Sequence, residues 1–315
     1  MNLEGLTNAS RGVADWLRTS TDTIRENGFE GLRDVGQDLY GSVWWLTWPL
    51  PIGTNVYDRE WDVLVILDAC RVDLLRSVSD EYDYLGDVDR LWSVGSMSKE
   101  WMAKTFVDDY SAEVRETAYV TANVFSERMT SADWFRALEE VWRNGWDRNH
   151  GTVPPRAVTD SAIRTARTVD PERLIVHYVQ PHHPFLPLDR GYDARPFGPD
   201  AEDTVVDALR KEKIDRDRFW KAYRDNLRLV LDDLELLLAN VDADNVAITA
   251  DHGDALGEWG IYDHPVGFLH PAVRSVPWVT TTATDERTHE PEGKAKADGN
   301  GVSVRKRLQS LGYLD

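Results

Sequence analysis

At 315 residues with 42% hydrophobic content, the chain is long enough to form one large α/β domain or two smaller ones around a sizeable core. Its 36 basic and 55 acidic residues give a formal net charge of −19, which argues against nucleic acid as a partner because a polyanion would be repelled. The single cysteine, Cys70, excludes an internal disulfide.

The first 57 residues (1–57) are predicted to form a helical extension before the main domain. Apolar residues recur at helical spacing between residues 5 and 40, and Gly28 divides this stretch into two short amphipathic helices. The start of the chain, Met1–Gly5, lacks the basic and apolar regions of a signal peptide, which predicts a cytoplasmic protein.

A tryptophan-rich stretch, residues 43–52, lies near the end of this extension and contains Trp44, Trp45 and Trp48. It is far shorter than the roughly 20 residues that a membrane-spanning helix needs, and it contains two prolines. Clustered Trp favours the membrane interface, so peripheral membrane contact is one interpretation. The other, which we favour, is an aromatic segment buried against the domain.

Unbroken apolar runs indicate a central sheet that begins after Trp61. The runs at 63–67, 173–179 and 245–250 have the composition of strands buried on both faces. Helical patterns lie between them, so residues 58–283 are predicted to form a three-layer α/β sandwich with a mostly parallel sheet. Further elements are expected as strands at 118–122 and 275–281, helices at 99–108, 130–144, 157–168 and 206–240, and a polar loop with a short C-terminal helix over 284–315.

Side chains that can bind metals follow three of these strands. The first strand runs into Asp68, the middle one into His182 and His183, and the later one into Asp251 and His252. Because the carboxyl ends of parallel strands converge on one crevice, these groups are candidates for binding one divalent metal ion. Each also has a structural alternative: the aspartates as helix N-caps or loop residues, and the histidines as packed or capping groups.

Residues 249–260 carry a specific pattern around the Asp-His pair. This stretch resembles the motif T-x-D-H-G-D/E-x-L-G-E-x-G of the sulfatase-like branch of the alkaline phosphatase superfamily. In that family an apolar strand ends in the first metal-binding Asp, as Val65–Asp68 does here. Residues 182–185 are similar to the family's H-x-P-F loop, and 275–278 to its V-P-W/L/F segment. The resemblance covers roughly residues 60–281.

The resemblance implies an alkaline phosphatase-like fold and a metal-dependent hydrolase or transferase of phosphate or sulfate esters. One divalent ion, of Zn, Mn, Mg or Ca, would be held by Asp68, Ser96, Asp251 and His252. His182, the first His of the H-x-P-F loop, would bind the ester oxygens. The expected partner is therefore an ester substrate, with glycan-linked and lipid-linked esters included.

The composition bears on the source of the protein. It is rich in Asp and poor in Lys, which fits either an ordinary acidic cytosolic protein or one kept soluble in high salt. We favour the second interpretation, with a halophilic archaeon as the expected source.

The nucleophile is expected in the Ser-rich turn that precedes the helix at 99–108. A hydroxyl at a helix start suits this role because the helix N-terminus and a metal both favour the alkoxide. Residues 96–101, set against the pattern T-S-D-S-E-F of lipoteichoic-acid-synthase-like members, put Ser96 in the nucleophile's place. Ser98 is the alternative nucleophile, and otherwise a substrate-binding residue or a helix N-cap. Attack by Ser96 on phosphorus would leave a covalent phosphoseryl intermediate.

The sequence around Cys70 bears on whether the substrates are phosphate or sulfate esters. Sulfatases proper convert a Cys in a C-x-P-x-R signature to formylglycine, and residues 70–74 do not fit that signature. We expect Cys70 to be a small buried residue and phosphate esters to be the favoured substrates. The alternatives are a sulfuric ester hydrolase acting on a glycan or glycolipid, and a catalytically degenerate binding protein.

Three further residues complete the predicted site. Arg71 would hold the ester oxygens in a bidentate grip or, alternatively, pair with a nearby carboxylate. His183 would contact the substrate. His264 would act as a general acid or bind substrate, since imidazole titrates near neutral pH. Asp263, His264 and His270 would be the late ligands of a second metal ion, but a single ion is the simpler assignment.

Overall fold

The computed structural model describes residues 52–186, 204–293 and 303–311. The chain divides into two units, Met1–Leu50 and Pro51–Asp315, and the described residues all belong to the second. The predicted N-terminal helices and the three clustered tryptophans lie outside them. Among the helices within the described ranges, none is long and apolar enough to cross a lipid bilayer.

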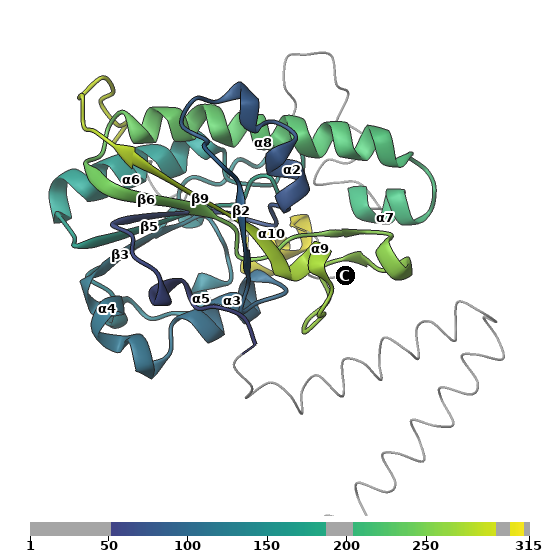
Figure 1. Ribbon diagram of the computed structural model, residues 1–315, viewed down its shortest axis with the longest axis horizontal. Coiled ribbons are helices and arrows are strands. Elements are labelled where there is room, and N and C mark those ends of the chain that lie inside the picture. The colour runs from purple at the N-terminus through teal and green to yellow at the C-terminus, as the bar shows by residue number, and fades with distance from the viewer. Residues whose placement is uncertain (1–51, 187–203, 294–302, 312–315) are drawn as a thin grey trace, which may run out of the picture. The chain divides into compact units, whose positions relative to one another are not determined.

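A seven-stranded sheet forms the centre of the second unit (Figure 1). Its strands lie in the order β2-β9-β6-β1-β5-β3-β4, and β7 pairs with β8 in a separate hairpin. The strands are β1 (Val63–Leu67), β2 (Asp89–Trp92), β3 (Thr117–Thr121), β4 (Ala137–Glu140), β5 (Arg173–Tyr178), β6 (Ala243–Thr249), β7 (Ala255–Leu256), β8 (Tyr262–Asp263) and β9 (Ser275–Ala283).

The sheet is mostly parallel, as predicted. The neighbouring pairs from β6 to β4 are all parallel, and β9 runs antiparallel to both β6 and β2. The five strands expected from the sequence are all present. Because β1 lies between β5 and β6, the residues that follow these three strands meet at one edge of the sheet.

Strand β1 explains why the sequence there is apolar throughout. Val63, Val65 and Leu67 belong to the core on one face of the sheet, and Leu64 and Ile66 to the core on the other. This division follows from the alternation of side chains along a strand. All five residues are buried, because helices cover both faces of the sheet.

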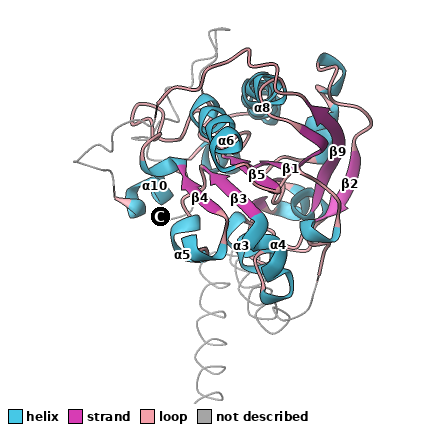
Figure 2. Ribbon diagram, turned by 90° about the vertical axis from the view of Figure 1, so that its left-hand side faces the viewer, coloured by secondary structure: helices cyan, strands magenta, loops and turns pink. Residues whose placement is uncertain are grey.

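Helices α6 and α8 lie on one face of the sheet, and α3, α4 and α5 on the other (Figure 2). The helices are α2 (Val72–Arg76), α3 (Ser98–Thr105), α4 (Ser111–Glu116), α5 (Ser126–Met129), α6 (Pro155–Val169), α7 (Val205–Arg210), α8 (Arg216–Leu238), α9 (Pro271–Arg274) and α10 (Val304–Ser310). The long helix α8 buries Leu227, Leu231 and Leu234, whose spacing of three to four residues places them on one side of the helix.

The helix predicted over 130–144 is wrong. This segment forms the edge strand β4 between two 3-10 turns, Ala132–Trp134 and Val141–Arg143. β4 pairs in parallel with β3, from Ala118 opposite Ala137 to Thr121 opposite Glu140. Its Ala-Leu-Glu-Glu sequence favours a helix, but pairing satisfies backbone groups that β3 would otherwise leave exposed, and this tertiary demand prevails.

The segment predicted as one helix over 206–240 is helical, but it is divided into two helices, α7 and α8. α7 ends at Arg210, and α8 starts at Arg216. Between them Glu212 has a left-handed φ of 54°, which no helix accommodates. Asp215 then caps α8 by accepting a hydrogen bond from the backbone N–H of Arg218 at 2.7 Å.

The segment after β9 packs back against α6. Arg167 Nη2 lies 2.7 Å from Asp285 Oδ1, and His289 Nε2 lies 2.6 Å from Asp160 Oδ1. The polar residues 284–293 therefore belong to the same folded unit as the sheet.

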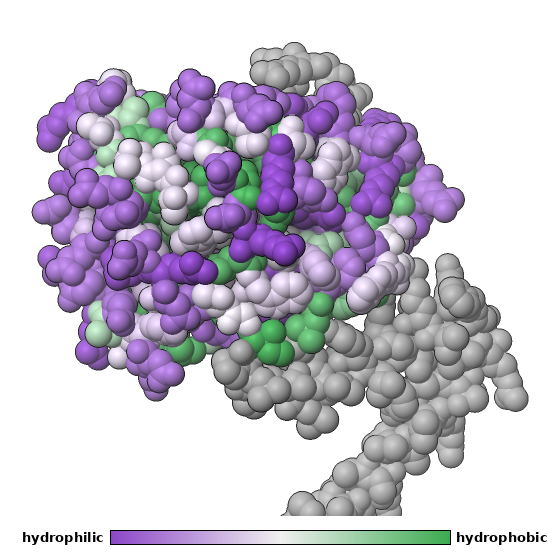
Figure 3. Space-filling model, in the orientation of Figure 1, coloured by the Kyte–Doolittle hydropathy of each residue, from purple (hydrophilic) through white to green (hydrophobic). Residues whose placement is uncertain are grey.

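Most of the surface in view is hydrophilic, which agrees with the charged composition (Figure 3).

Candidate functional site

The side chains expected to bind a metal ion meet at the sheet edge where β1, β5 and β6 end. Asp68 directly follows β1, and the pair Asp251 and His252 lies just beyond β6. Ser98 is the first residue of α3, which approaches the same edge. All four residues are 0% exposed. A site of this kind is dry, so its charges interact strongly.

The two carboxylate oxygens of Asp68 have different surroundings. Oδ2 accepts a hydrogen bond from Asn123 Nδ2 at 2.8 Å and lies 3.3 Å from Ser98 Oγ. Oδ1 lies 3.4 Å from His252 Nε2 and has no hydrogen-bond partner within the described ranges. The protein thus holds Oδ2 in place, whereas Oδ1 remains able to bind a metal ion.

Asp251 repeats this arrangement. Its Oδ1 accepts backbone hydrogen bonds from Ala69 at 3.2 Å and His252 at 2.9 Å, while Oδ2 has no hydrogen-bond partner among the residues described. Burial by itself would raise the pKa of Asp251, but the nearby His252 and His177 outweigh it and hold the pKa below its usual range. Asp251 is therefore a carboxylate anion.

His252 presents Nε2 to both aspartates. Its Nδ1–H donates to the Gly253 carbonyl at 2.9 Å, which fixes the ring, and Nε2 lies 3.5 Å from Asp251 Oδ2. Metal-binding histidines commonly donate their second ring N–H to an oxygen in this way. Gly253 is required because a Cβ there would collide with the carbonyl of Ala272.

Ser98 joins this cluster at the start of α3. Its Oγ lies 3.3 Å from Asp68 Oδ2 and 3.4 Å from His252 Nε2. The eight-residue helix α3 begins at this residue, so its N-terminal backbone dipoles also favour negative charge on the hydroxyl. The Ser98 hydroxyl thus lies beside a carboxylate and an imidazole.

The distances fit a divalent ion. The separations of 3.3 to 3.5 Å within the cluster exceed good hydrogen bonds. Two ligand atoms that each lie about 2.1 Å from one ion are about 3.0 to 3.6 Å apart at angles of about 90 to 120°. The unpartnered oxygens of Asp68 and Asp251 would both be satisfied by such an ion, whereas buried groups left without a partner are costly.

Ser96, the predicted nucleophile, lies in a different environment. Its hydroxyl is 2.8 Å from Glu100 Oε2, 2.9 Å from the Pro265 carbonyl and 2.7 Å from the Gly267 N–H. These contacts tie the turn before α3 to the loop that carries His264. The Ser96 hydroxyl is thus hydrogen bonded within the protein, whereas the Ser98 hydroxyl lies beside Asp68 and His252.

Glu100 is the centre of a buried ion pair below this turn. Its Oε1 lies 2.8 Å from Arg274 Nη2 and 2.9 Å from Lys104 Nζ. Arg274 is 0% exposed and also donates to the carbonyls of Phe268 at 3.1 Å and Ser93 at 3.3 Å. The pair joins α3 to the segment between β8 and β9.

Replacing Glu100 by Gln is expected to lower the free energy of unfolding by about 3 kcal/mol, because one partner of a buried ion pair is removed. Urea unfolding at neutral pH measures this loss. The same change at the exposed Glu116 of α4 is the matched control, with an expected effect within about 0.5 kcal/mol. Equal effects of the two substitutions would contradict a stabilising role for the pair.

The Glu100 variant also predicts a pH dependence. Burial opposes ionisation of Glu100, but Arg274 outweighs it and lowers the pKa of the carboxyl. A carboxyl with a lowered pKa in the folded state stabilises the protein above its unfolded pKa of about 4.3, and this contribution is lost as the pH falls through the folded pKa. The difference between wild type and Glu100→Gln should therefore shrink in acid.

Four histidines form a row beside the cluster. Ring centroids are 4.4 Å apart for His252 and His264, 5.2 Å for His264 and His182, and 4.3 Å for His182 and His183. Burial lowers the pKa of both His182 and His183. The structure thus brings together three of the predicted substrate-binding or acid groups next to Asp251 and its neighbour His252.

His264 is held between two carboxylates. Its Nδ1 lies 2.6 Å from Asp263 Oδ1 and 3.3 Å from Asp254 Oδ1. Burial opposes the charge, but these carboxylates raise the pKa of His264 well above its ordinary value. These three residues form a second group with ligand-type atoms. His270 is engaged elsewhere, since its Nδ1 accepts the Ala272 N–H at the start of α9.

Arg71 is committed to protein carboxylates. Nε and Nη2 donate to Asp73 at 2.9 and 2.7 Å, and Nη1 donates to Glu258 Oε1 at 2.9 Å and to the Asp254 carbonyl at 2.7 Å. The ion-pair alternative of the sequence analysis therefore describes Arg71 better than a grip on ester oxygens. Through its bonds to the Asp254 carbonyl and Glu258, Arg71 anchors the segment 254–258 to the start of α2.

Cys70 is 0% exposed and lies between β1 and α2. Burial raises the pKa of its thiol well above the ordinary value, so the reactive thiolate is suppressed. This agrees with the expectation of a small buried residue.

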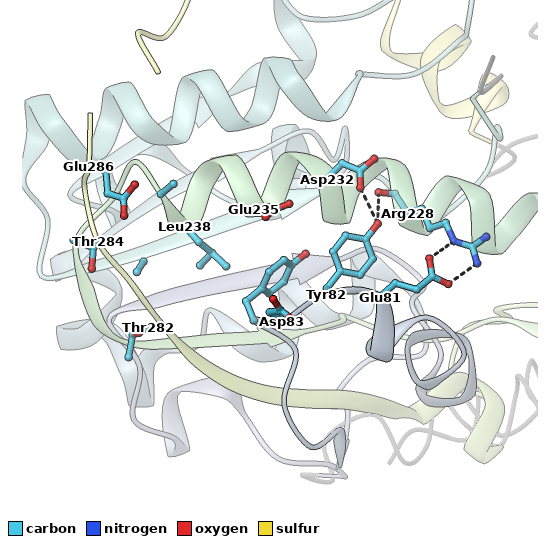
Figure 4. Close-up of a pocket in the computed structure, with 13 residues that line it drawn as sticks. Glu81, Tyr82, Asp83, Arg228, Asp232, Glu235, Leu238, Thr282, Thr284 and Glu286 are labelled. Carbon is cyan, nitrogen blue, oxygen red and sulfur yellow. Dashed lines mark hydrogen bonds and ion pairs between the residues drawn. The ribbon is translucent and has the colours of Figure 1, made fainter. Parts of the chain in front are cut away.

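A surface pocket elsewhere on the molecule shares no residue with this site. It has a volume of about 610 Å³ and is lined by residues 81–84, by α8 and by the end of β9 (Figure 4). Its polar groups already bind one another: Tyr82 Oη donates to Asp232 at 2.8 Å, and Arg228 holds Glu81 with two bonds of 2.7 and 2.8 Å.

Two residues at the site were not anticipated from the sequence. Asn123 follows β3 and fixes Asp68, and His177 lies within β5 with Nε2 3.6 Å from Asp251 Oδ2. A signal for His177 exists, because it is a polar residue inside an otherwise apolar strand. Nothing in the sequence distinguishes Asn123 from an ordinary loop residue.

Comparisons with known proteins bear on the fold. No protein-family model matches the sequence, and no curated protein matches it. The integral membrane protein lipooligosaccharide phosphoethanolamine transferase A (EptA) from Neisseria meningitidis is similar in structure, with a TM-score of 0.51, 15% identity, and coverage of 98% of this chain and 66% of that chain. The soluble domain of the same transferase gives a TM-score of 0.49, 15% identity, and coverage of 80% and 86%.

A protein in the alkaline phosphatase superfamily from Vibrio parahaemolyticus is also similar, with a TM-score of 0.41, 13% identity, and coverage of 78% of this chain and 66% of that chain. At such identities the similarity concerns the fold. The chain has a mostly parallel α/β fold similar to that of the phosphoethanolamine transferase EptA.

Proposed function

We propose that the protein is a metal-dependent hydrolase or transferase of phosphate esters and that Ser98 is its nucleophile. The observation that carries this proposal is the position of Ser98 Oγ, 3.3 Å from Asp68 Oδ2 and 3.4 Å from His252 Nε2 at the start of α3. The similarity to a phosphoethanolamine transferase supports phosphate esters as the substrate class.

Asp68, Ser98, Asp251 and His252 would hold one divalent ion, in place of the set with Ser96 that the sequence predicts. When bound, the ion supplies Lewis-acid stabilisation of negative charge on the nucleophile and the ester. Asn123 keeps the Asp68 carboxylate in position through its 2.8 Å hydrogen bond.

In the first step, Ser98 acts as an alkoxide whose proton has passed to solvent. Its Oγ forms a bond to phosphorus as the bond from phosphorus to the leaving oxygen breaks. His264 gives its proton to the leaving oxygen, with Asp263 holding the ring through Nδ1. The product of this step is a phosphoserine at residue 98.

In the second step, water or an acceptor alcohol attacks the phosphoseryl phosphorus and gives its proton to the now neutral His264. The Ser98 Oγ–P bond breaks, and the alkoxide is restored. His182 would hold the non-bridging oxygens during both steps.

Replacing His264 by Gln is expected to affect poor leaving groups most. Alkyl phosphates need a proton on the departing oxygen, so their kcat should fall roughly 100- to 10,000-fold. Aryl phosphates leave without that proton, so the phosphorylation step should be much less affected. Steady-state and pre-steady-state rates with both ester types measure the difference.

The control for this prediction is His150→Gln in the turn before α6, remote in sequence from the motif and paired with Asp147. It should leave both rates unchanged. Equal losses for alkyl and aryl esters in His264→Gln would remove His264 from the acid role.

The proposed function is tested by elemental analysis of the purified protein and a panel of aryl phosphate monoesters, diesters and sulfates. We expect about one divalent ion per chain and phosphate turnover that a chelator abolishes. Assays at low and high salt test the halophilic interpretation in the same series. A protein without stoichiometric metal would support the binding-only alternative, and faster turnover of sulfates would support the sulfuric ester alternative.

A further inference from the structure

His177 lies in the middle of the sheet, and its ring points at the carboxylates of Asp68 and Asp251. It sits in β5, opposite Ile66 of β1 and Thr121 of β3, and is 0% exposed. Its Nε2 is 3.6 Å from Asp251 Oδ2 and 4.0 Å from Asp68 Oδ2. Within the described part of the chain, this nitrogen has no hydrogen-bond partner.

The other ring nitrogen is fixed. His177 Nδ1 and Tyr119 Oη are hydrogen bonded at 2.9 Å, and the edge of the ring packs on Trp101 with centroids 5.6 Å apart. Tyr119 is itself 0% exposed. The imidazole is therefore held in one orientation, with Nε2 directed at the two aspartates.

We propose that His177 Nε2 is an additional ligand of the divalent ion, so that the site contains two carboxylates, two imidazoles and the Ser98 hydroxyl. This inference rests on the proposed function, because it takes the ion of that site as given. In the ligand form of His177, Nδ1–H donates to Tyr119 Oη, and Nε2 carries a lone pair.

The alternative is an ordinary buried histidine that donates Nε2–H to the aspartates. Distances of 3.6 and 4.0 Å are too long for such bonds, and a buried N–H without a partner would be costly. Asp68, His177 and Asp251 each offer one ligand-type atom, and these three atoms all lie within 4.8 Å of one another. A bound divalent ion would give a partner to the buried polar atoms of these residues that lack one.

A second imidazole changes which metals the site prefers. Carboxylates and water suit Mg and Ca, whereas imidazoles suit Zn and related transition metals. With His177 and His252 both bound, the site should select Zn over Mn, Mg and Ca. Of the four metals that the sequence analysis allows, this ligand set therefore favours Zn.

X-ray absorption spectroscopy of the full chain loaded with one Zn per molecule tests the inference, because the outer-shell scattering of imidazole rings can be counted without any activity assay. We expect two imidazoles in the wild type and one in His177→Phe. Tyr119→Phe, which removes the outer hydrogen bond but keeps the ring, should still show two. Competition with a chelating dye should give a Zn dissociation constant raised roughly 100-fold or more in His177→Phe.

A count of one imidazole in the wild type overturns the inference, whatever the affinity of the variants. If His177→Phe fails to fold, the wild-type count still decides. A wild type that binds no Zn, Mn, Mg or Ca overturns the proposed function together with this inference. A wild type that binds Zn through one imidazole overturns this inference alone.

Discussion

Replacing Ser98 by Ala is expected to lower kcat/KM for aryl phosphates by roughly a thousandfold or more, because the covalent route is lost. The hydroxyl lies 3.3 Å from Asp68 and 3.4 Å from His252, so no neighbouring group takes its place. The fold should survive the change, since one buried hydroxyl is removed without creating a large cavity. Rates from purified variants, compared at equal metal loading, measure the effect.

Ser96→Ala is the matched control, two residues away in the same turn. We expect activity within about tenfold of wild type and a free energy of unfolding lower by about 1 to 3 kcal/mol, because Glu100 and the Gly267 N–H lose a buried partner. The two substitutions thus separate chemistry from stability. Loss of turnover in Ser96→Ala with retention in Ser98→Ala would reverse the assignment.

Replacing Asp251 by Asn should abolish metal binding. The amide keeps the shape of the carboxylate and can still accept the backbone bonds from Ala69 and His252, but it removes the charge and one ligand oxygen. Metal content should fall from about one ion per chain to a small fraction of that value, and activity should fall with it. Elemental analysis after gel filtration gives the metal content directly.

The same variant makes a thermal prediction. An ion present at about 100 times its dissociation constant stabilises the folded state by about 2.7 kcal/mol, so the wild-type Tm should rise when metal is added. Asp251→Asn should show no rise, whereas Asp244→Asn, at an exposed position early in β6, should behave as wild type. A metal-induced rise that persists in Asp251→Asn would place the ion elsewhere.

The sequence predicts the sheet well because its central strands are buried on both faces. An apolar run such as Val63–Leu67 is typical of a strand that is buried on both faces, and such a strand must have neighbours on both sides in the sheet. The edges are less determined. β4 has a helix-favouring sequence and becomes a strand only through its pairing with β3, which depends on contacts distant in the chain.

The proposed metal ligands Asp68, Asp251 and His252 are predictable for the same reason, since each lies just beyond a recognisable strand. The nucleophile is harder to assign. Ser96 and Ser98 are two residues apart, and which hydroxyl points inward depends on where α3 begins and on the contacts of Glu100. Ser96 also contacts Pro265 and Gly267, which are distant in the sequence. These contacts could not be predicted from the sequence around the serines.

The most direct test of the central claim is to locate the covalent phosphate. His264→Gln should slow release of the intermediate while still accepting phosphate from an aryl ester. After acid quenching, fragmentation mass spectrometry of the tryptic peptide 91–99 distinguishes its three serines. Phosphate on Ser98 is the predicted result. Phosphate on Ser96, or turnover without any phosphorylated serine, would contradict the account.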